Sequence, residues 1–169
     1  INFDTIYSFL IVDLTSPVTI ELPLTGGRYQ SAEVLDDEHY IPFIFTKPGR
    51  YELTEASVGS RHAIVIFRTQ VNIQDPDDMN KVIALQDGIK IEQQNSGEYS
   101  QTNNWDMEDI LSMRKQYQQR AVKEGTKSED MAGKKEDITV DMHNFGVAVG
   151  WGGLTKEGAA YLFFQEASA

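Results

Sequence analysis

Turn-forming residues recur about every ten residues through the first part of this chain, and short segments rich in β-branched and aromatic side chains lie between them. Residues 25–27 and 47–49 are such turns, built on glycine and proline. Residues 18–22 alternate apolar and polar side chains, as a half-buried strand does, whereas 63–67 are apolar on both faces. A further strand is predicted over 40–45. The pattern predicts a mainly antiparallel β-sandwich or jelly-roll-like block over about residues 1–74.

Helix signals follow the β block. Asp75 suits an N-cap, Pro76 suits the first helical position, and Gly88 suits the end of a helix. Apolar side chains at three- and four-residue spacing predict a second helix over about 106–123 and a third over about 137–149. Because strands come first and helices second, with no alternation of the two, the fold class is α+β.

The chain is expected to divide into three parts. We predict a β-rich domain over 1–92, a polar linker over 93–104, and a helical segment over 105–169 that ends in a strand at about 160–165. Both ends of the chain are apolar and strand-like, which favours a fragment or a short relative of a longer protein. The terminal strands could also pair with a second copy, so self-association through edge strands is an open alternative.

Composition excludes several classes of function. The chain carries a net charge of -11 and has no basic patch, which argues against binding nucleic acid or an anionic membrane. No cysteine is present, so disulfides, thiolate metal sites and cysteine nucleophiles are excluded. No apolar run is long enough to span a membrane, and no motif indicates a cofactor or a metal, so we expect neither.

A group of polar and aromatic residues in the predicted strands is the best candidate for a site. Arg28 and Arg68 lie within strands, where an inward-facing arginine needs a carboxylate partner, and Asp4 is a candidate for that partner. Such an ion pair could simply hold two sheets together, or it could form part of a pocket for an anionic or carbonyl-bearing small molecule. The aromatic residues that could line this pocket are Tyr7, Tyr29 and Tyr40.

The sequence offers less support for catalysis. The G-x-S-x-G turn of many serine hydrolases is missing, and the closeness of Ser60 and His62 in sequence is no evidence for a triad, because triads are assembled across space. His39, with Asp4 as its carboxylate, is the candidate general base for a hydrolase-type alternative. The acidic residues 36–38 beside His39 are better explained as a solvated turn than as a metal site.

Several segments, in their order along the chain, resemble the family that carries the domain of unknown function DUF1254. Residues 2–8 (N-F-D-T-I-Y-S) are similar to the family's N-R-D-T-L-Y-S stretch, and 23–31 (P-L-T-G-G-R-Y-Q-S) to its P-D-x-G-x-R-Y-x-S hairpin. Residues 71–87 resemble its V-x-D-P-x-D and A-L-Q-D helix, and residues from His143 to Tyr161 resemble the segment that leads into the companion domain DUF1214. The chain departs from the pattern at Phe3, where the family has arginine.

The resemblance implies β-sandwich or jelly-roll domains interleaved with helices, and it implies export, since many members of the family are exported. It does not name an activity. We therefore expect a non-catalytic binding or structural module that is soluble, with a hydrolase-type enzyme acting near Asp4, Arg28 and His39 as one alternative and a self-associating structural protein as another.

Overall fold

The structure is a computed structural model, and it describes residues 4–99, 104–124, 131–150 and 153–155. The chain forms two compact units, residues 1–100 and residues 101–169. The boundary between the units falls within the predicted linker. Seven strands and four helices are present in the described residues, and all strand pairs are antiparallel, so the predicted α+β class is confirmed.

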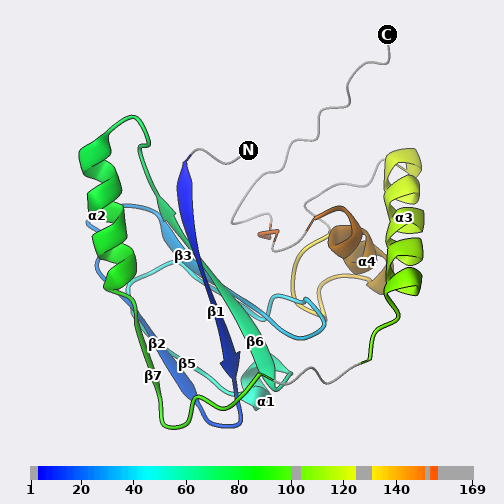
Figure 1. The fold of residues 1–169 in the computed structure, drawn as a ribbon, viewed down its shortest axis with the longest axis horizontal. Helices are drawn as coiled ribbons and strands as arrows, with labels where there is room; N and C mark the ends of the chain where they lie inside the picture. The colour runs from blue at the N-terminus through cyan, green and yellow to red at the C-terminus, as the bar shows by residue number, and fades with distance from the viewer. Residues whose placement is uncertain (1–3, 100–103, 125–130, 151–152, 156–169) are drawn as a thin grey trace. The chain divides into compact units, whose positions relative to one another are not determined.

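The first unit contains a four-stranded sheet, sheet A, with strand order β1-β6-β3-β4. Its strands are β1 (Thr5–Asp13), β6 (His62–Gln70), β3 (Gln30–Leu35) and β4 (Phe43–Phe45). The long strand β6 lies in the middle and pairs with β1 on one side and with β3 on the other (Figure 1).

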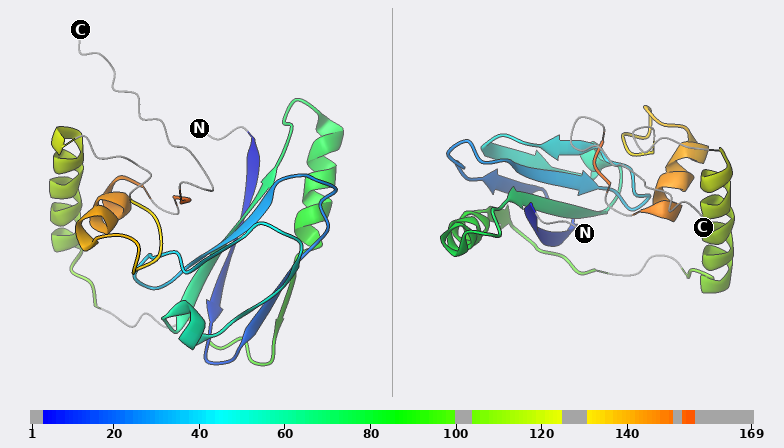
Figure 2. Two further views of the ribbon diagram at one scale, coloured as in Figure 1. Left: turned by 180° about the vertical axis from the view of Figure 1, so that it is seen from behind. Right: turned by 90° about the horizontal axis from the view of Figure 1, so that it is seen from above.

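Sheet B has three strands in the order β5-β2-β7. They are β5 (Gly49–Leu53), β2 (Val18–Leu22) and β7 (Lys90–Gln93). The two sheets form the layers of a sandwich (Figures 1 and 2), and one cluster of buried side chains from both sheets fills the space between them. The fully buried members of this cluster are Val18, Ile20, Ala32, Val34, Leu53 and Val65.

Two helices belong to the first unit. Helix α2 (Pro76–Asp87) lies along one side of the sandwich and buries Val82 completely (Figures 1 and 2). Its predicted start is confirmed, since the side chain of Asp75 accepts the N–H of Asp77 at 3.0 Å. The short α1 (Glu55–Val58) was not expected, although Thr54 and Ser57 form a reciprocal capping box at its start.

The second unit contains α3 (Met107–Glu124) and α4 (Val140–Val149), close to the predicted bounds. Phe145 of α4 is fully buried and its ring meets the ring of Tyr117 of α3 edge-on, 5.3 Å between centroids. Met107 and Leu111, two apolar residues at the start of α3, are exposed.

One strand prediction differs from the structure in its bounds. The segment predicted as a strand over 40–45 contributes only Phe43–Phe45, because the carboxylate of Asp36 accepts the N–H groups of Glu38 and Tyr40 and closes a turn. The predicted closing strand at 160–165 lies outside the described residues. Self-association through edge strands stays a prediction.

Candidate functional site

The outer faces of the two sheets differ in chemistry. The outer face of sheet B carries an exposed network of ion pairs in which Arg50 binds Glu21 and Glu92, and Lys90 binds Glu21. This is the usual solvated surface of a sheet. The outer face of sheet A is mostly apolar, and it contains ionisable side chains that are buried. A functional site is therefore better sought on sheet A.

Strand register defines what lies on the outer face of sheet A. Alternate residues of β6 point into the core, Ala63, Val65 and Phe67 among them. The others, from His62 through Ile64 and Ile66 to Arg68, therefore face outward. Both ends of this row are polar and its middle is apolar, so two polar centres share one face of the sheet. They are about 20 Å apart along β6, at about 3.3 Å per residue.

The first centre, which we call the Arg68 centre, is built on a buried ion pair. Arg68 is opposite Tyr7 of β1 and opposite Ser31 of β3 in the register. Its Nη1 donates to Oε2 of Glu33 at 2.6 Å, and its guanidinium carbon lies 5.1 Å from the centre of the Tyr7 ring. Glu33 is fully buried and Arg68 is 5% exposed. The sequence-predicted Arg68 and Tyr7 are thus brought together here.

Three polar atoms of this centre have no hydrogen-bond partner although they are buried: the hydroxyl of Tyr29, the hydroxyl of Ser31 and Oε1 of Glu33. The three residues alternate along one strand, since the carbonyl of Tyr29 continues the β3–β6 ladder by accepting the N–H of Gln70. Their side chains therefore face the same side as Arg68. Buried polar groups are nearly always paired in native proteins, so this concentration needs an explanation.

The protonation behaviour of the pair follows from its burial. Burial raises the pKa of Glu33 from its ordinary 4.5 to about 7, and the neighbouring Arg68 offsets this only in part. Burial works against the charged form of Arg68 as well, yet its pKa is raised because Glu33 and Tyr7 stabilise the cation. Glu33 is therefore able to act as a hydrogen-bond donor near neutral pH, while Arg68 stays charged.

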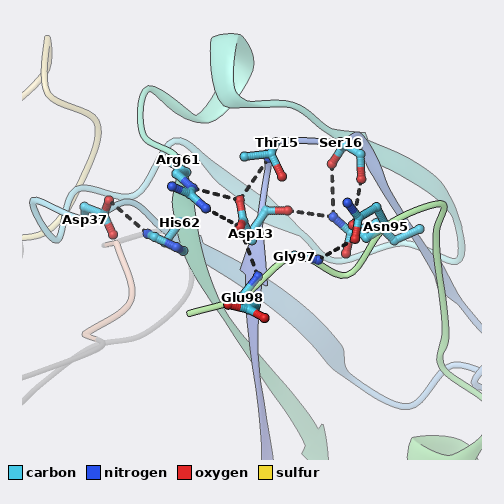
Figure 3. Close-up of polar contacts among 10 residues, drawn as sticks. Asp13, Thr15, Ser16, Asp37, Arg61, His62, Asn95, Gly97 and Glu98 are labelled. Carbon is cyan, nitrogen blue, oxygen red and sulfur yellow. Dashed lines mark hydrogen bonds and ion pairs between the residues drawn. The ribbon is translucent and has the colours of Figure 1, made fainter. Parts of the chain in front are cut away.

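The second centre, the His62 centre, lies where β6 begins (Figure 3). His62 is 3% exposed, and its Nε2 is buried without a partner. Its Nδ1 lies 3.8 Å from Oδ2 of Asp37, which is too long for a hydrogen bond but close enough for an ion pair if the ring is protonated. The ring of Tyr99 meets the imidazole edge-on at 5.5 Å. Ser60 accepts the N–H of Asp37 and donates to the carbonyl of His62.

Beside His62, the carboxylate of Asp13 is the hub of a fully paired network (Figure 3). It accepts two hydrogen bonds from Arg61, at 3.1 and 2.8 Å, and the N–H groups of Thr15 and Glu98. These donors, with Arg61 first, hold the pKa of Asp13 well below its ordinary value. The network ties the ends of β1 and β6 to the segment after β7, and we interpret it as structural.

The remaining sequence-predicted site residues are not brought together. Arg28 binds Asp78 of α2 through both of its terminal nitrogens and donates to the carbonyl of Gln70 at 2.7 Å, so its carboxylate is Asp78 and not Asp4. The reason is that Arg28 precedes β3 and extends toward α2. Asp78 keeps a pKa lowered to about 2, mainly through Arg28.

Asp4 and His39 lie at opposite ends of sheet A. The carbonyl of Asp4 accepts the N–H of Val71, beyond the end of β6, whereas His39 lies in the turn after β3, near the start of β6. The predicted His39–Asp4 pairing is therefore not formed. His39 adopts a left-handed φ of 73° in that turn, and its neighbour Tyr40 is buried.

Sequence reasoning missed Glu33, Ser31, Asp37 and the role of His62. One signal was present: an arginine in a buried strand requires a carboxylate, and Glu33 lies in the middle of the neighbouring buried strand. No comparable signal marked Asp37, because only the tertiary structure brings it close to His62.

Within the part of the chain that the structure describes, no three His, Cys, Asp or Glu side chains are grouped so that they could hold a metal ion. No described helix is both long enough and apolar enough to cross a bilayer.

Comparisons with known proteins establish the fold only. No family model and no curated protein matches the chain. The fold is similar to the crystal structure of the VPA0106 protein from Vibrio parahaemolyticus, a Northeast Structural Genomics Consortium target, with a TM-score of 0.67 and 17% sequence identity over 91% of this chain. The match covers 58% of the VPA0106 chain, so the present chain spans well under two thirds of that protein.

Proposed function

We propose that the first unit is a non-catalytic binding module, and that the outer face of sheet A binds a small molecule through a carbonyl or carboxylate group at the Arg68 centre. The observation that carries this proposal is the set of three unpartnered buried polar atoms on Tyr29, Ser31 and Glu33. Each such atom costs about 1–3 kcal/mol of stability. Three together cost a large fraction of the roughly 5–15 kcal/mol that stabilises a domain, which is hard to reconcile with a purely structural role.

The chemistry of the centre favours an oxygen acceptor as the ligand group. The hydroxyls of Tyr29 and Ser31 can each donate a hydrogen bond, and Glu33 can donate one when it is protonated. Next to them, the rings of Tyr7 and Phe9 are stacked at 6.3 Å between centroids and are 41% and 59% exposed. An aromatic or apolar part of the ligand could pack on these rings.

The matched pair benzamide and benzoate tests the proposal, because both present a ring and a carbonyl-type head. We expect each to shift the backbone amide resonances of Ser31, Glu33 and Arg68 in the ¹⁵N-labelled full chain. Ser31→Ala should weaken binding about tenfold, the worth of one well-placed hydrogen bond. The variant should not lose stability, since the hydroxyl has no partner in the protein.

Arg50→Gln, on the outer face of sheet B, is the matched control and should bind both compounds as the unmodified chain does. A site elsewhere would be indicated if the shifts avoid β3 and β6, or if Ser31→Ala binds equally well. Either result, or a lack of binding by both compounds, would refute the proposed site.

A second candidate function is acid–base catalysis at the His62 centre, of the hydrolase type. It is favoured by a buried imidazole whose Nε2 is unpartnered while its Nδ1 faces the carboxylate of Asp37. A carboxylate at this distance would stabilise the ring electrostatically when Nε2 accepts a proton from a substrate. The hydroxyl of Ser60 is held by backbone groups and is not placed as a nucleophile.

Hydrolysis of p-nitrophenyl acetate would test this second candidate. Activity should fall in His62→Gln and Asp37→Asn and should be unchanged in His39→Gln, with circular dichroism verifying that each variant is folded. Equal activity in all four proteins would exclude a catalytic role for the His62 centre.

Membership of the DUF1254 family, with a DUF1254-like domain over 1–92 and a helical segment over 105–169 that leads toward a DUF1214-like part, remains part of the proposal. It is supported by the order of the sequence segments that resemble the family.

A further inference from the structure

The outer face of sheet A carries one strong cation near the Arg68 centre. In the described strands, the outward-facing residues of β1, β3, β4 and β6 include no lysine and no arginine other than Arg68. That cation already faces the carboxylate of Glu33 at 2.6 Å. When Glu33 is ionised the pair is electrically neutral, so a carboxylate ligand would then bring a second anion to the site.

Two carboxylates that share one buried site cannot both stay ionised without a large electrostatic cost, and the usual result is that the pair holds one proton. We propose that the Arg68 centre binds a carboxylate ligand together with one proton, which Glu33 receives; this proposal rests on the proposed function. A neutral carbonyl ligand binds there without a proton. The ligand class is then a monocarboxylic acid in its net uncharged form, or a neutral amide, ketone or ester.

The surroundings of Glu33 support its role as the group that takes the proton. On its own face it has apolar neighbours on both sides, Ile66 of β6 and Ile44 of β4. The charged group that acts on it is Arg68, 2.6 Å away. The carboxylates of Asp13 and Asp37 lie at the opposite end of β6. Burial has already brought the pKa of Glu33 close to neutral, so a nearby second anion needs to raise it only a little further.

The test is the pH dependence of two dissociation constants, measured by NMR titration of the full chain between pH 6 and pH 9. Benzoate should bind with a constant affinity below the pKa of Glu33 and about tenfold more weakly for each pH unit above it, because one proton is taken up. The affinity of benzamide should stay nearly constant, because a primary amide can accept from the protonated form of Glu33 and donate to the ionised form. Calorimetry at pH 8 in phosphate and in Tris buffer should show the uptake of one proton with benzoate and none with benzamide.

Glu33→Gln mimics the protonated side chain and is the decisive variant. It should bind benzoate at pH 8 at least as well as the unmodified chain does, and the pH dependence should disappear. If benzoate binding depends on Ser31 but is independent of pH, the proton coupling is wrong and the binding site stands. If neither compound binds at β3 and β6, the proposed function itself is refuted and the coupling falls with it.

Discussion

Replacement of Glu33 by glutamine gives the sharpest test of the electrostatics at the Arg68 centre in the absence of any ligand. The substitution keeps the shape of the side chain and an oxygen that can accept from Arg68, but it removes the charge. Because the pKa of Glu33 is raised from 4.5 to about 7 in the folded chain, the folded state binds a proton more tightly than the unfolded state does. Between these two values, stability must therefore fall as the pH rises.

The size of the effect follows from the shift. A shift of one pKa unit corresponds to about 1.36 kcal/mol, so the shift of Glu33 from 4.5 to about 7 corresponds to about 3 kcal/mol of stability. This stability is present below pH 4.5 and is lost by pH 7 and above. Between pH 5.5 and pH 7.5 the loss is about 2 kcal/mol. The glutamine side chain does not titrate, so the Glu33→Gln variant should match the unmodified chain near pH 4 and exceed it by about 3 kcal/mol at pH 8.

Native-state amide hydrogen exchange is a suitable assay, because it reports the opening of the first unit alone. The amides of Val34 and Val65, whose side chains are fully buried in β3 and β6, give the local free energy of unfolding at each pH. Comparison with the variant cancels contributions from the histidines. The reasoning is refuted if Glu33→Gln is less stable than the unmodified chain at pH 8, as it would be if the ion pair were net stabilising.

Three other substitutions test separate features of the first unit. Gly97→Ala should reduce the free energy of unfolding by on the order of 2–3 kcal/mol, because φ is 63° and a Cβ would lie 2.6 Å from Cβ and Cγ of Asp13. Gly26→Ala is the control and should reduce it clearly less, since its φ of 65° is similar but the space around it is open. Equal thermal unfolding temperatures for the two variants would contradict the steric argument. Tyr29→Phe should leave stability unchanged or raise it by about 1 kcal/mol in urea unfolding, since its hydroxyl is unpartnered, and a marked loss would reveal a missed partner. Asp78→Asn should reduce stability at pH 7, and it should make the fall in stability between about pH 4 and pH 2 less steep, because the pKa of Asp78 is lowered in the folded chain. An unchanged acid unfolding transition would show that the Arg28–Asp78 pair contributes nothing to stability.

The sequence was sufficient to predict most of the fold because the local signals agree with the tertiary structure. The alternation in 18–22, the turn at 25–27 and the N-cap at Asp75 all specify conformation through neighbouring residues. The strand predicted from residue 40 failed for a local reason as well. The side chain of Asp36 competes for the backbone N–H groups that a strand would have used.

The candidate site was harder to predict because strand pairing decides it. The residue types were right in part, since Arg68 does have a carboxylate partner and does lie against Tyr7. The strand register decides which carboxylate lies close to which arginine. Arg28 precedes β3 and binds Asp78 of α2 instead of a carboxylate on sheet A. Nothing in the order of residues along the chain indicates that Glu33 is opposite Ile66 or that Asp37 approaches His62.

The pairing of distant segments also determines how the first unit can be made. Val18, in the middle strand of sheet B, pairs with Gln93, and Thr5 pairs with Gln70. On the ribosome, β2 emerges long before β7, and sheet B stays incomplete until the nascent chain has passed α2. Pairings of such long range fold slowly and leave apolar strands exposed meanwhile. We therefore expect premature termination ahead of β7 to produce chains that aggregate or are degraded.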